Sequence, residues 1–181
     1  IMGMKSNRHF CLLAHSDDHY AKLKNALGFE LSRRIGLAYT PEHRPVEVVL
    51  NGQYIGLYFL TEKIRVEKDR VNIEEQQDRD TTLTHITGGW LLEIDNNLDE
   101  NTLVFKETNT GHWYDRLWIT PHSPENLSKE QTLYIRTFIE ATNAAIYDSV
   151  KTSTDWEKYI DIDSLVSFYI IGEIMDDIEY F

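Results

Sequence analysis

The sequence contains very little cysteine and few basic residues relative to acidic ones. Cys11 is the only cysteine among 181 residues, which excludes an internal disulfide and any metal site built from several thiolates. Lys and Arg number 18 against 30 Asp and Glu, so the formal net charge is −12. This balance argues against nonspecific binding of DNA or RNA, which depends on clustered basic residues. An anionic nucleotide would need a local basic patch or a metal ion.

Long apolar runs and several familiar motifs are also absent. No segment reaches the roughly 20 apolar residues of a membrane-spanning helix, and the start of the chain lacks the apolar core of a secretory signal. The sequence has no G-x-G-x-x-G, H-R-D or D-F-G string, no Walker A sequence and no motif of a Ser/His/Asp nucleophile. Membership of the ordinary protein kinases is therefore not supported.

The composition that is present indicates a folded protein. Hydrophobic residues make up 41% of the chain and aromatic residues 12%, which is too apolar for a mainly disordered chain. A length of 181 residues suits one domain with a substantial core, and two tightly joined lobes are also compatible with it. Because the chain starts at Ile1 and ends in apolar and acidic sequence at Phe181, we expect it to be part of a longer protein.

The N-terminal segment predicts a strand followed by a helix. Residues 9–14 are typical of a short buried strand. Ser16 is the expected N-cap of a helix that ends near Ile35, where Gly36 suits a left-handed C-cap. The apolar positions of this helix recur at three- or four-residue spacing: Tyr20, Leu23, Leu27, Leu31 and Ile35.

A hairpin is the strongest local prediction. Val46–Leu50 alternates, Asn51-Gly52 supplies two residues that accept positive φ, and β-rich sequence resumes at Tyr54. This pattern predicts a type I′ turn between paired strands. With further strands expected at 90–94 and 102–106, residues 1–120 should form one antiparallel sheet with one helix.

The second half of the chain predicts helices. Ser128 and Gln131 fit a capping box at the start of one helix. Asp163 is the expected cap of another helix, which has so little polar face that we expect it to be buried nearly all round. Pro121 and Pro124 mark the expected boundary, so residues 121–181 form the start of a helical lobe. The fold class is α+β.

Three stretches resemble the spore coat protein H (CotH) kinase family. They are FCLLAHSDDHYAKLKNALGFELSRRIGL near the start, VEVVLNGQYIGLYFLTEKIRVEKDRVNI with the later GGWLLEID, and DIDSLVSFYIIGEIMDD near the end. Lys24 stands where the family usually has Arg. The resemblance implies an atypical protein kinase-like fold, in which the strand-rich lobe precedes the helical lobe.

The resemblance also implies an activity and a set of residues. Family members transfer phosphate from ATP to protein Ser or Thr hydroxyls, using Mg or Mn and acidic residues. The resemblance implies that Asp177 and Glu179 are catalytic residues and that Asp176 and Asp177 are metal ligands. The spacing of these three acidic residues departs from the Asn-x-Asp that is usual in the family. A Trp-Asp-Phe-Asp-like segment and a Lys-bearing strand of the family are not found in this sequence. The chain by itself is therefore expected to be inactive.

Three further residues are predicted to bind the nucleotide. Glu30 lies on a helix placed like the one that orients a phosphate-binding Lys in kinases, and Glu62 with Lys63 ends the second hairpin strand, where a kinase-like fold has its hinge. The alternative for each is an ordinary exposed charge.

A second function is compatible with the same fold. A noncatalytic surface scaffold, or a carbohydrate- or protein-binding module, would use the Tyr- and Trp-rich strands as its contact surface. The resemblance implies an extracytoplasmic or cell-surface location in either case. Two metal-like patterns are better explained without metal. The series from Asp95 to Asn101 lacks the Gly and the closing Glu of a calcium loop, and His15 and His19 straddle an expected strand–helix junction.

Overall fold

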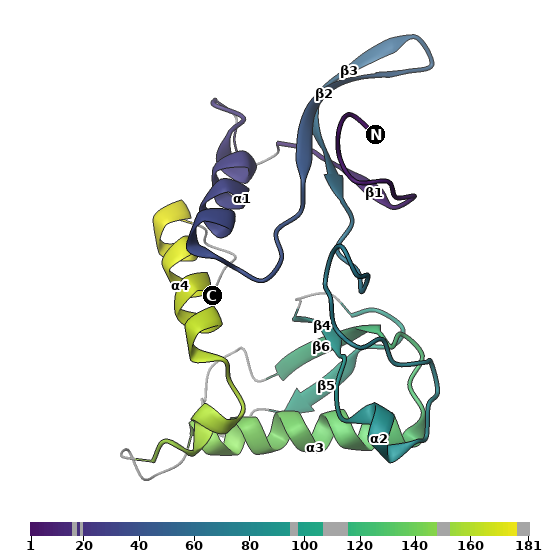
Figure 1. Cartoon of the computed structure of the whole chain (residues 1–181), viewed down its shortest axis with the longest axis vertical. Coiled ribbons are helices and arrows are strands. Elements are labelled where there is room, and N and C mark those ends of the chain that lie inside the picture. The colour runs from purple at the N-terminus through teal and green to yellow at the C-terminus, as the bar shows by residue number, and fades with distance from the viewer. Residues whose placement is uncertain (16–17, 19, 95–97, 107–115, 148–152, 177–181) are drawn as a thin grey trace. The chain divides into compact units, whose positions relative to one another are not determined.

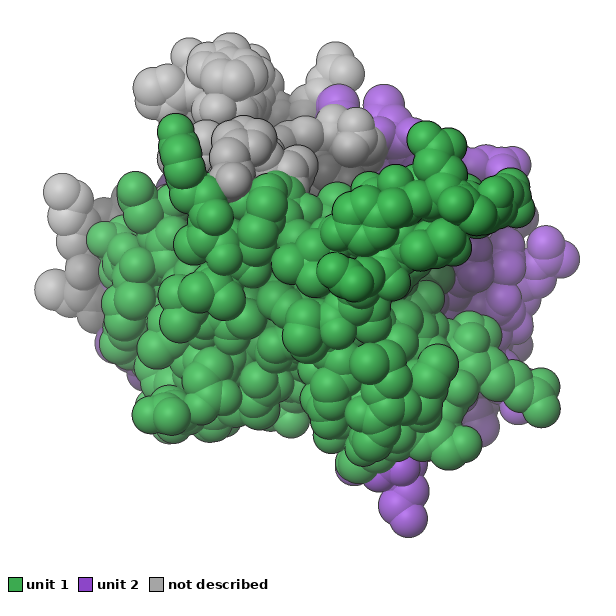
Figure 2. All heavy atoms as spheres, turned by 90° about the horizontal axis from the view of Figure 1, so that it is seen from above, with its two compact units in different colours: residues 1–64, 160–181 green, residues 65–159 purple. Residues whose placement is uncertain are grey.

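The computed structural model describes residues 1–15, 18, 20–94, 98–106, 116–147 and 153–176. The chain divides into two compact units, coloured in Figure 2. Unit 1 comprises residues 1–64 and 160–181, and unit 2 comprises residues 65–159. Each unit has its own three-stranded antiparallel sheet, and the described residues include four α-helices. The predicted α+β class is confirmed, but the single sheet predicted over residues 1–120 is wrong.

The sheet of unit 1 contains the predicted hairpin. Its strands are β1 (Phe10–Leu13), β2 (His43–Leu50) and β3 (Gln53–Glu62), in the order β1-β3-β2 (Figure 1). The turn residues Asn51 and Gly52 have φ values of 51° and 81°, which confirms the predicted type I′ turn. One feature was not predicted. Val48 pairs with Gly56 and Val49 with Tyr54, so Ile55 is an extra residue that forms a β-bulge.

The first helix of unit 1 begins later than the sequence predicts. Helix α1 (Lys24–Ile35) ends at Gly36 with a φ of 88°, as expected. Its expected cap Ser16 lies outside the described residues. The carboxylate of Asp18 accepts hydrogen bonds from the backbone N–H groups of Ala21, Leu23 and Lys24, so it ties the turn before the helix to the first helical residue. The start predicted at Ser16 is therefore wrong.

The second helix of unit 1, α4 (Ile162–Met175), differs from its prediction in two ways. Asp161 is the N-cap, because its Oδ1 accepts from the Ser164 N–H; Asp163 lies in the first turn. The helix packs against α1, yet Ile171 and Gly172 are its only buried members, so the prediction of burial nearly all round is wrong. Apolar side chains on several faces stay exposed, including Leu165, Val166, Phe168, Tyr169, Ile170 and Ile174.

Unit 2 contains a second sheet with one strand that the sequence did not predict. Strands β4 (Leu91–Ile94) and β5 (Leu103–Lys106) flank β6 (Arg116–Ser123), in the order β4-β6-β5. The boundary predicted from Pro121 and Pro124 falls at β6. Pro121 lies inside the strand, where the β4–β6 register shifts, and both prolines are fully buried. The division into lobes at residue 120 stays a prediction.

The helices of unit 2 close its core. Helix α3 (Lys129–Ile146) starts with the predicted capping box between Ser128 and Gln131. It covers a cluster of buried apolar side chains that consists of Leu103, Phe105, Ile119 and Ile135. Helix α2 (Leu83–Ile86) and the short 3-10 helix η1 (Asp155–Lys158) complete the unit. Within the described residues of the chain, no helix combines the length and apolar character that crossing a membrane requires.

Candidate functional site

The acidic end of α4 is the first part of the candidate site. Asp176 follows the last helical turn in a left-handed conformation, with φ 47° and ψ 52°, and its N–H donates to the Gly172 carbonyl. Asp is among the residues that tolerate this conformation, which ends the helix. Asp176 is exposed to solvent. The predicted Asp177 and Glu179 lie outside the described residues.

Carboxylates such as Asp176 have the chemistry that a hard divalent cation requires. Mg and Mn prefer oxygen ligands. In the part of the chain that the structure describes, no three His, Cys, Asp or Glu side chains gather as a metal-binding group. A site centred on α4 would therefore need the acidic residues that follow Asp176.

Glu30 lies on the surface of α1 and already has cationic partners. Its carboxylate accepts from the Arg34 Nε at 2.7 Å and lies 3.6 Å from the Arg33 Nε. The hydrogen bond from Arg34 and the charges of both guanidinium groups lower the pKa of Glu30. Such i,i+3 and i,i+4 pairs are typical of an exposed helix surface. Its nucleotide-binding role stays a prediction.

Glu62 and Lys63 differ from each other at the end of β3. Glu62 is only 4% exposed, so the alternative of an ordinary exposed charge is wrong for this residue. Its Oε2 accepts from the Tyr39 hydroxyl at 3.2 Å and from the Glu42 N–H at 3.0 Å, which ties the segment between α1 and β2 to the sheet. Lys63 is exposed, and its backbone N–H donates to the His9 carbonyl.

A cluster of rings between α1 and the sheet of unit 1 was not predicted. The buried Phe59 ring contacts the rings of His15 and His43, with centroids 4.8 and 5.0 Å away, and His43 also contacts Phe29 of α1 at 5.0 Å. His15 Nε2 and His43 Nδ1 are buried without a hydrogen-bond partner among the described residues. The alternation of β2 and β3 could have indicated that these rings share one face.

The electrostatics of His43 follow from this position. Burial lowers its pKa first, and the nearby charges of Arg33 and Arg44 lower it further, while Glu30 opposes them. These effects favour the neutral form of the histidine. Because Arg33 and Glu30 lie on α1, the pKa of His43 depends on the charges of that helix.

The series that resembles a calcium loop serves the fold of unit 2. The Asn101 side chain donates to the carbonyls of Pro121 and Glu125, and the Asp99 N–H donates to the Thr102 hydroxyl. These hydrogen bonds are those of a polar turn. Asp95 and Asn97 lie outside the described residues, as does His19 of the discounted histidine pair.

The comparison with protein families identifies the chain. The profile described as CotH kinase protein matches residues 1–179. The chain belongs to the CotH kinase protein family. A comparison with curated proteins and one with solved structures each gave no match. The resemblance seen in the sequence is confirmed, and the part matched to the CotH family includes every predicted site residue from Glu30 to Glu179.

Every predicted site residue that the structure describes lies in unit 1 of this CotH family chain. Helix α1 with Glu30 contacts α4, whose end carries Asp176, while Glu62 and Lys63 end β3. The described contacts of Glu30 and Glu62 are with neighbouring protein groups. Asp176 and Lys63 present exposed side chains in the same unit.

Proposed function

We propose that this chain is part of an atypical protein kinase that transfers the terminal phosphoryl group of ATP to a Ser or Thr hydroxyl of a protein. The observation that carries the proposal is the family match over residues 1–179. The strand, helix and hairpin order of unit 1 is compatible with the small lobe of a kinase-like fold. Fold order alone would be a weak argument, because one fold supports many functions.

The acidic residues after α4 are assigned roles by this proposal. Asp177 accepts the proton of the acceptor hydroxyl as its oxygen bonds to phosphorus and the bond from phosphorus to ADP breaks; Glu179 is the second catalytic candidate. Asp176 and Asp177 would hold Mg or Mn, which would neutralise charge on the phosphates. The capped helix α4 supports the segment, because its backbone bonds fix the position of Asp176.

The nucleotide side of the proposed site involves the end of β3 and helix α1. Lys63, whose side chain is exposed, follows the last residue of β3, and the buried Glu62 is suited to position this end of the strand. Glu30 would act through its two arginines, which carry the positive charge that phosphate requires. The substrate is a protein, and we propose an extracytoplasmic or cell-surface location on the basis of the family.

Metal-dependent nucleotide binding is the direct test of this proposal. We expect isothermal calorimetry of the folded full-length protein to detect ATP binding with Mg or Mn and to lose it with EDTA, because a chain of charge −12 repels a free triphosphate. Radiolabelled ATP should then label an added protein on Ser or Thr. Absent binding under both conditions, in a sample whose circular dichroism shows a folded protein, would contradict the proposal.

Two aromatic residues of unit 2, Trp90 and Tyr134, have partners within that unit. The Trp90 Nε1 donates to the Ile86 carbonyl and the Tyr134 hydroxyl to the Thr87 carbonyl. Their rings stack 6.2 Å apart, and Trp90 packs against the core of the unit. These two side chains stabilise unit 2. The noncatalytic alternative, in which aromatic residues of the strands form a contact surface, stays a prediction that a negative ATP test would favour.

A further inference from the structure

The turn of the β2–β3 hairpin is exposed and has few contacts. Asn51 and Gly52 form this turn, and both are exposed to solvent. Among the described residues, neither the Asn51 side chain nor the Gly52 N–H has a hydrogen-bond partner. A side-chain carbon at Gly52 would meet no atom within 4 Å, so no neighbouring group covers the turn at this point. The side-chain amide and the backbone nitrogen that follows it are therefore free to approach each other.

Asn51 differs from every other asparagine in the sequence, because it alone is followed by glycine. Glycine has no Cβ, so its backbone nitrogen meets little steric hindrance from the residue before it. Other asparagines are restrained. The side-chain amides of Asn101 and Asn126 donate to protein oxygens, and Asn25 and Asn143 lie inside α1 and α3.

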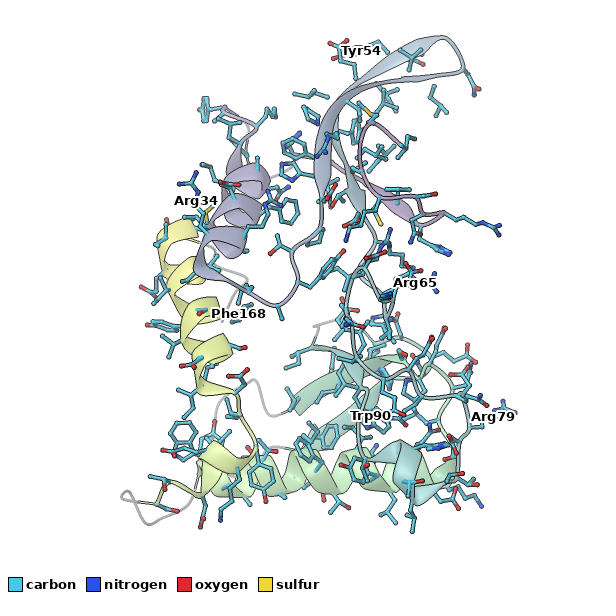
Figure 3. The ribbon with its side chains drawn as sticks, in the orientation of Figure 1. Arg34, Tyr54, Arg65, Arg79, Trp90 and Phe168 are labelled. Carbon is cyan, nitrogen blue, oxygen red and sulfur yellow. The ribbon has the colours of Figure 1, made fainter. Side chains whose placement is uncertain are left out.

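The tip of the hairpin, residues 49–54, is held only by its own ladder among the described residues. All six residues are exposed, including Tyr54, which is labelled in Figure 3 and is 58% exposed. The ladder between the turn and the bulge at Ile55 consists of two pairs, Leu50–Gln53 and Val49–Tyr54. Two strands without further packing are marginally stable, so the tip should open more readily than the part of β3 that pairs with β1.

We propose that Asn51 is a site of spontaneous deamidation, at which the turn converts its own asparagine to aspartate and isoaspartate. When the tip opens, the Gly52 nitrogen attacks Cγ of Asn51. The new N–Cγ bond forms, the Cγ–Nδ2 bond breaks, and ammonia leaves with the proton of the Gly52 nitrogen, which gives a cyclic succinimide. Water then adds to either ring carbonyl, returns a proton to the nitrogen and opens the ring. Water is the only co-reactant.

The two products affect the hairpin differently. Aspartate keeps the turn, because Asp-Gly is also favoured in type I′ turns. Isoaspartate continues the chain through the side-chain carbonyl and adds a carbon atom to the backbone, so the dihedral angles of the turn no longer fit. The ladder of the tip is then lost, while the bulge at Ile55 and the pairing of Phe59–Glu62 with β1 confine the loss to the tip. The proposal is independent of phosphoryl transfer, since the tip carries none of the proposed catalytic residues.

Ageing of the folded protein tests the site. The protein is incubated at mildly alkaline pH, which favours loss of the Gly52 proton, and peptide mapping by mass spectrometry follows each asparagine. We expect Asn51 to react at least about tenfold faster than Asn25 and Asn126 in the same sample. An isoaspartyl methyltransferase assay should detect isoaspartate in the peptide that contains residue 51. A rate equal to that of Asn126, aspartate as the sole product, or an unchanged Asn51 while a synthetic peptide of residues 46–58 reacts would overturn the proposal.

Two variants separate the reaction from its effect on the hairpin. Asn51→Gly suits the same turn but has no side-chain amide, so its peptide should form no isoaspartate. Freshly purified Asn51→Asp has the charge of the products and keeps the turn, so it is the matched control for structure. Amide hydrogen exchange within residues 49–54 should be faster in the aged protein than in Asn51→Asp, with Phe59–Glu62 unchanged. Equal exchange in the two samples, or faster exchange along all of β3, would contradict an effect confined to the tip.

Discussion

The two units of the molecule bury their apolar residues very differently. Unit 2 has a contiguous core of Leu103, Phe105, Ile119 and Ile135, and its fully buried Gln131 donates to Gln76 Oε1 and the Gln77 carbonyl. In unit 1 the buried apolar side chains are Met4, Phe59 and Ile171, while α4 and the hairpin expose theirs. Among the described residues, unit 2 therefore has the more continuous apolar packing, and unit 1 leaves more of its apolar side chains exposed.

The largest expected effect is on activity and lies in unit 1. Replacing Asp177 with Asn in the full-length protein removes a charge and keeps the shape. We expect phosphoryl transfer to fall by about two orders of magnitude or more, as for a positioned base or metal ligand. Radiolabelled transfer assays measure it, with urea unfolding as the check on stability. Wild-type activity in this variant would refute the catalytic role of Asp177. Asp176→Asn and Glu179→Gln test the roles of the other two acidic residues in the same way.

The next largest effect is on stability and lies in unit 2. Ile135→Ala removes a side chain that is 2% exposed and leaves a cavity in the core, so the free energy of unfolding should fall by about 2–5 kcal/mol. Leu133→Ala on the same helix is the matched control, because Leu133 is 69% exposed and should change stability by less than about 0.5 kcal/mol. Tryptophan fluorescence during urea unfolding measures both, since all four Trp lie in unit 2. Equal losses would contradict the core assigned here.

A smaller loss is expected when the buried polar network of unit 2 is broken. Gln131→Ala removes the side-chain bonds to Gln76, Gln77 and the Ser128 N–H, which should cost about 1–3 kcal/mol of unfolding free energy. Gln77→Ala is the control, because Gln77 accepts through its backbone carbonyl and its side chain is exposed. A result in which both changes are equally mild would indicate that the network adds little.

The smallest expected effect is a pH dependence of unit 1. The fold lowers the pKa of His43 below 6.5, so its contribution to stability is complete above about pH 6.5 and is lost as the pH falls from there through the lowered pKa. Amide exchange of α1 and β2 should accelerate over that window. His43→Asn should flatten the change, and an identical slope in this variant would assign the dependence to other groups.

Local sequence signals predicted local structure well. The Asn51-Gly52 turn, the Gly36 cap and the box between Ser128 and Gln131 were all predictable, because each depends on residues within one turn of the chain. The start of α1 was not, since the Asp18 carboxylate accepts hydrogen bonds from amides up to six residues away, in the turn before the helix and at its first residue.

Structure that depends on contacts between residues far apart in the chain was harder to predict from the sequence. Strand β6 escaped prediction because Pro121 and Pro124 normally mark turns, yet here they lie in and beside a buried strand. The family could be recognised from motifs. The site role of the acidic segment after α4 stays a prediction. The buried state of Glu62 could not be recognised, because it depends on Tyr39 and Glu42, which reach it only once α1 and the sheet have formed.

The order of the units along the chain has a consequence for biosynthesis. Unit 2 is a continuous segment, so it can fold as soon as residue 159 has left the ribosome. Unit 1 is assembled from both sides of that segment: α1 ends at Ile35, and its partner α4 begins only at Ile162. In the nascent chain, α1 and the hairpin are therefore synthesised before α4, and α1 lacks its partner helix until translation has passed unit 2. The folding of unit 2 then shortens the effective loop that α1 and α4 must close.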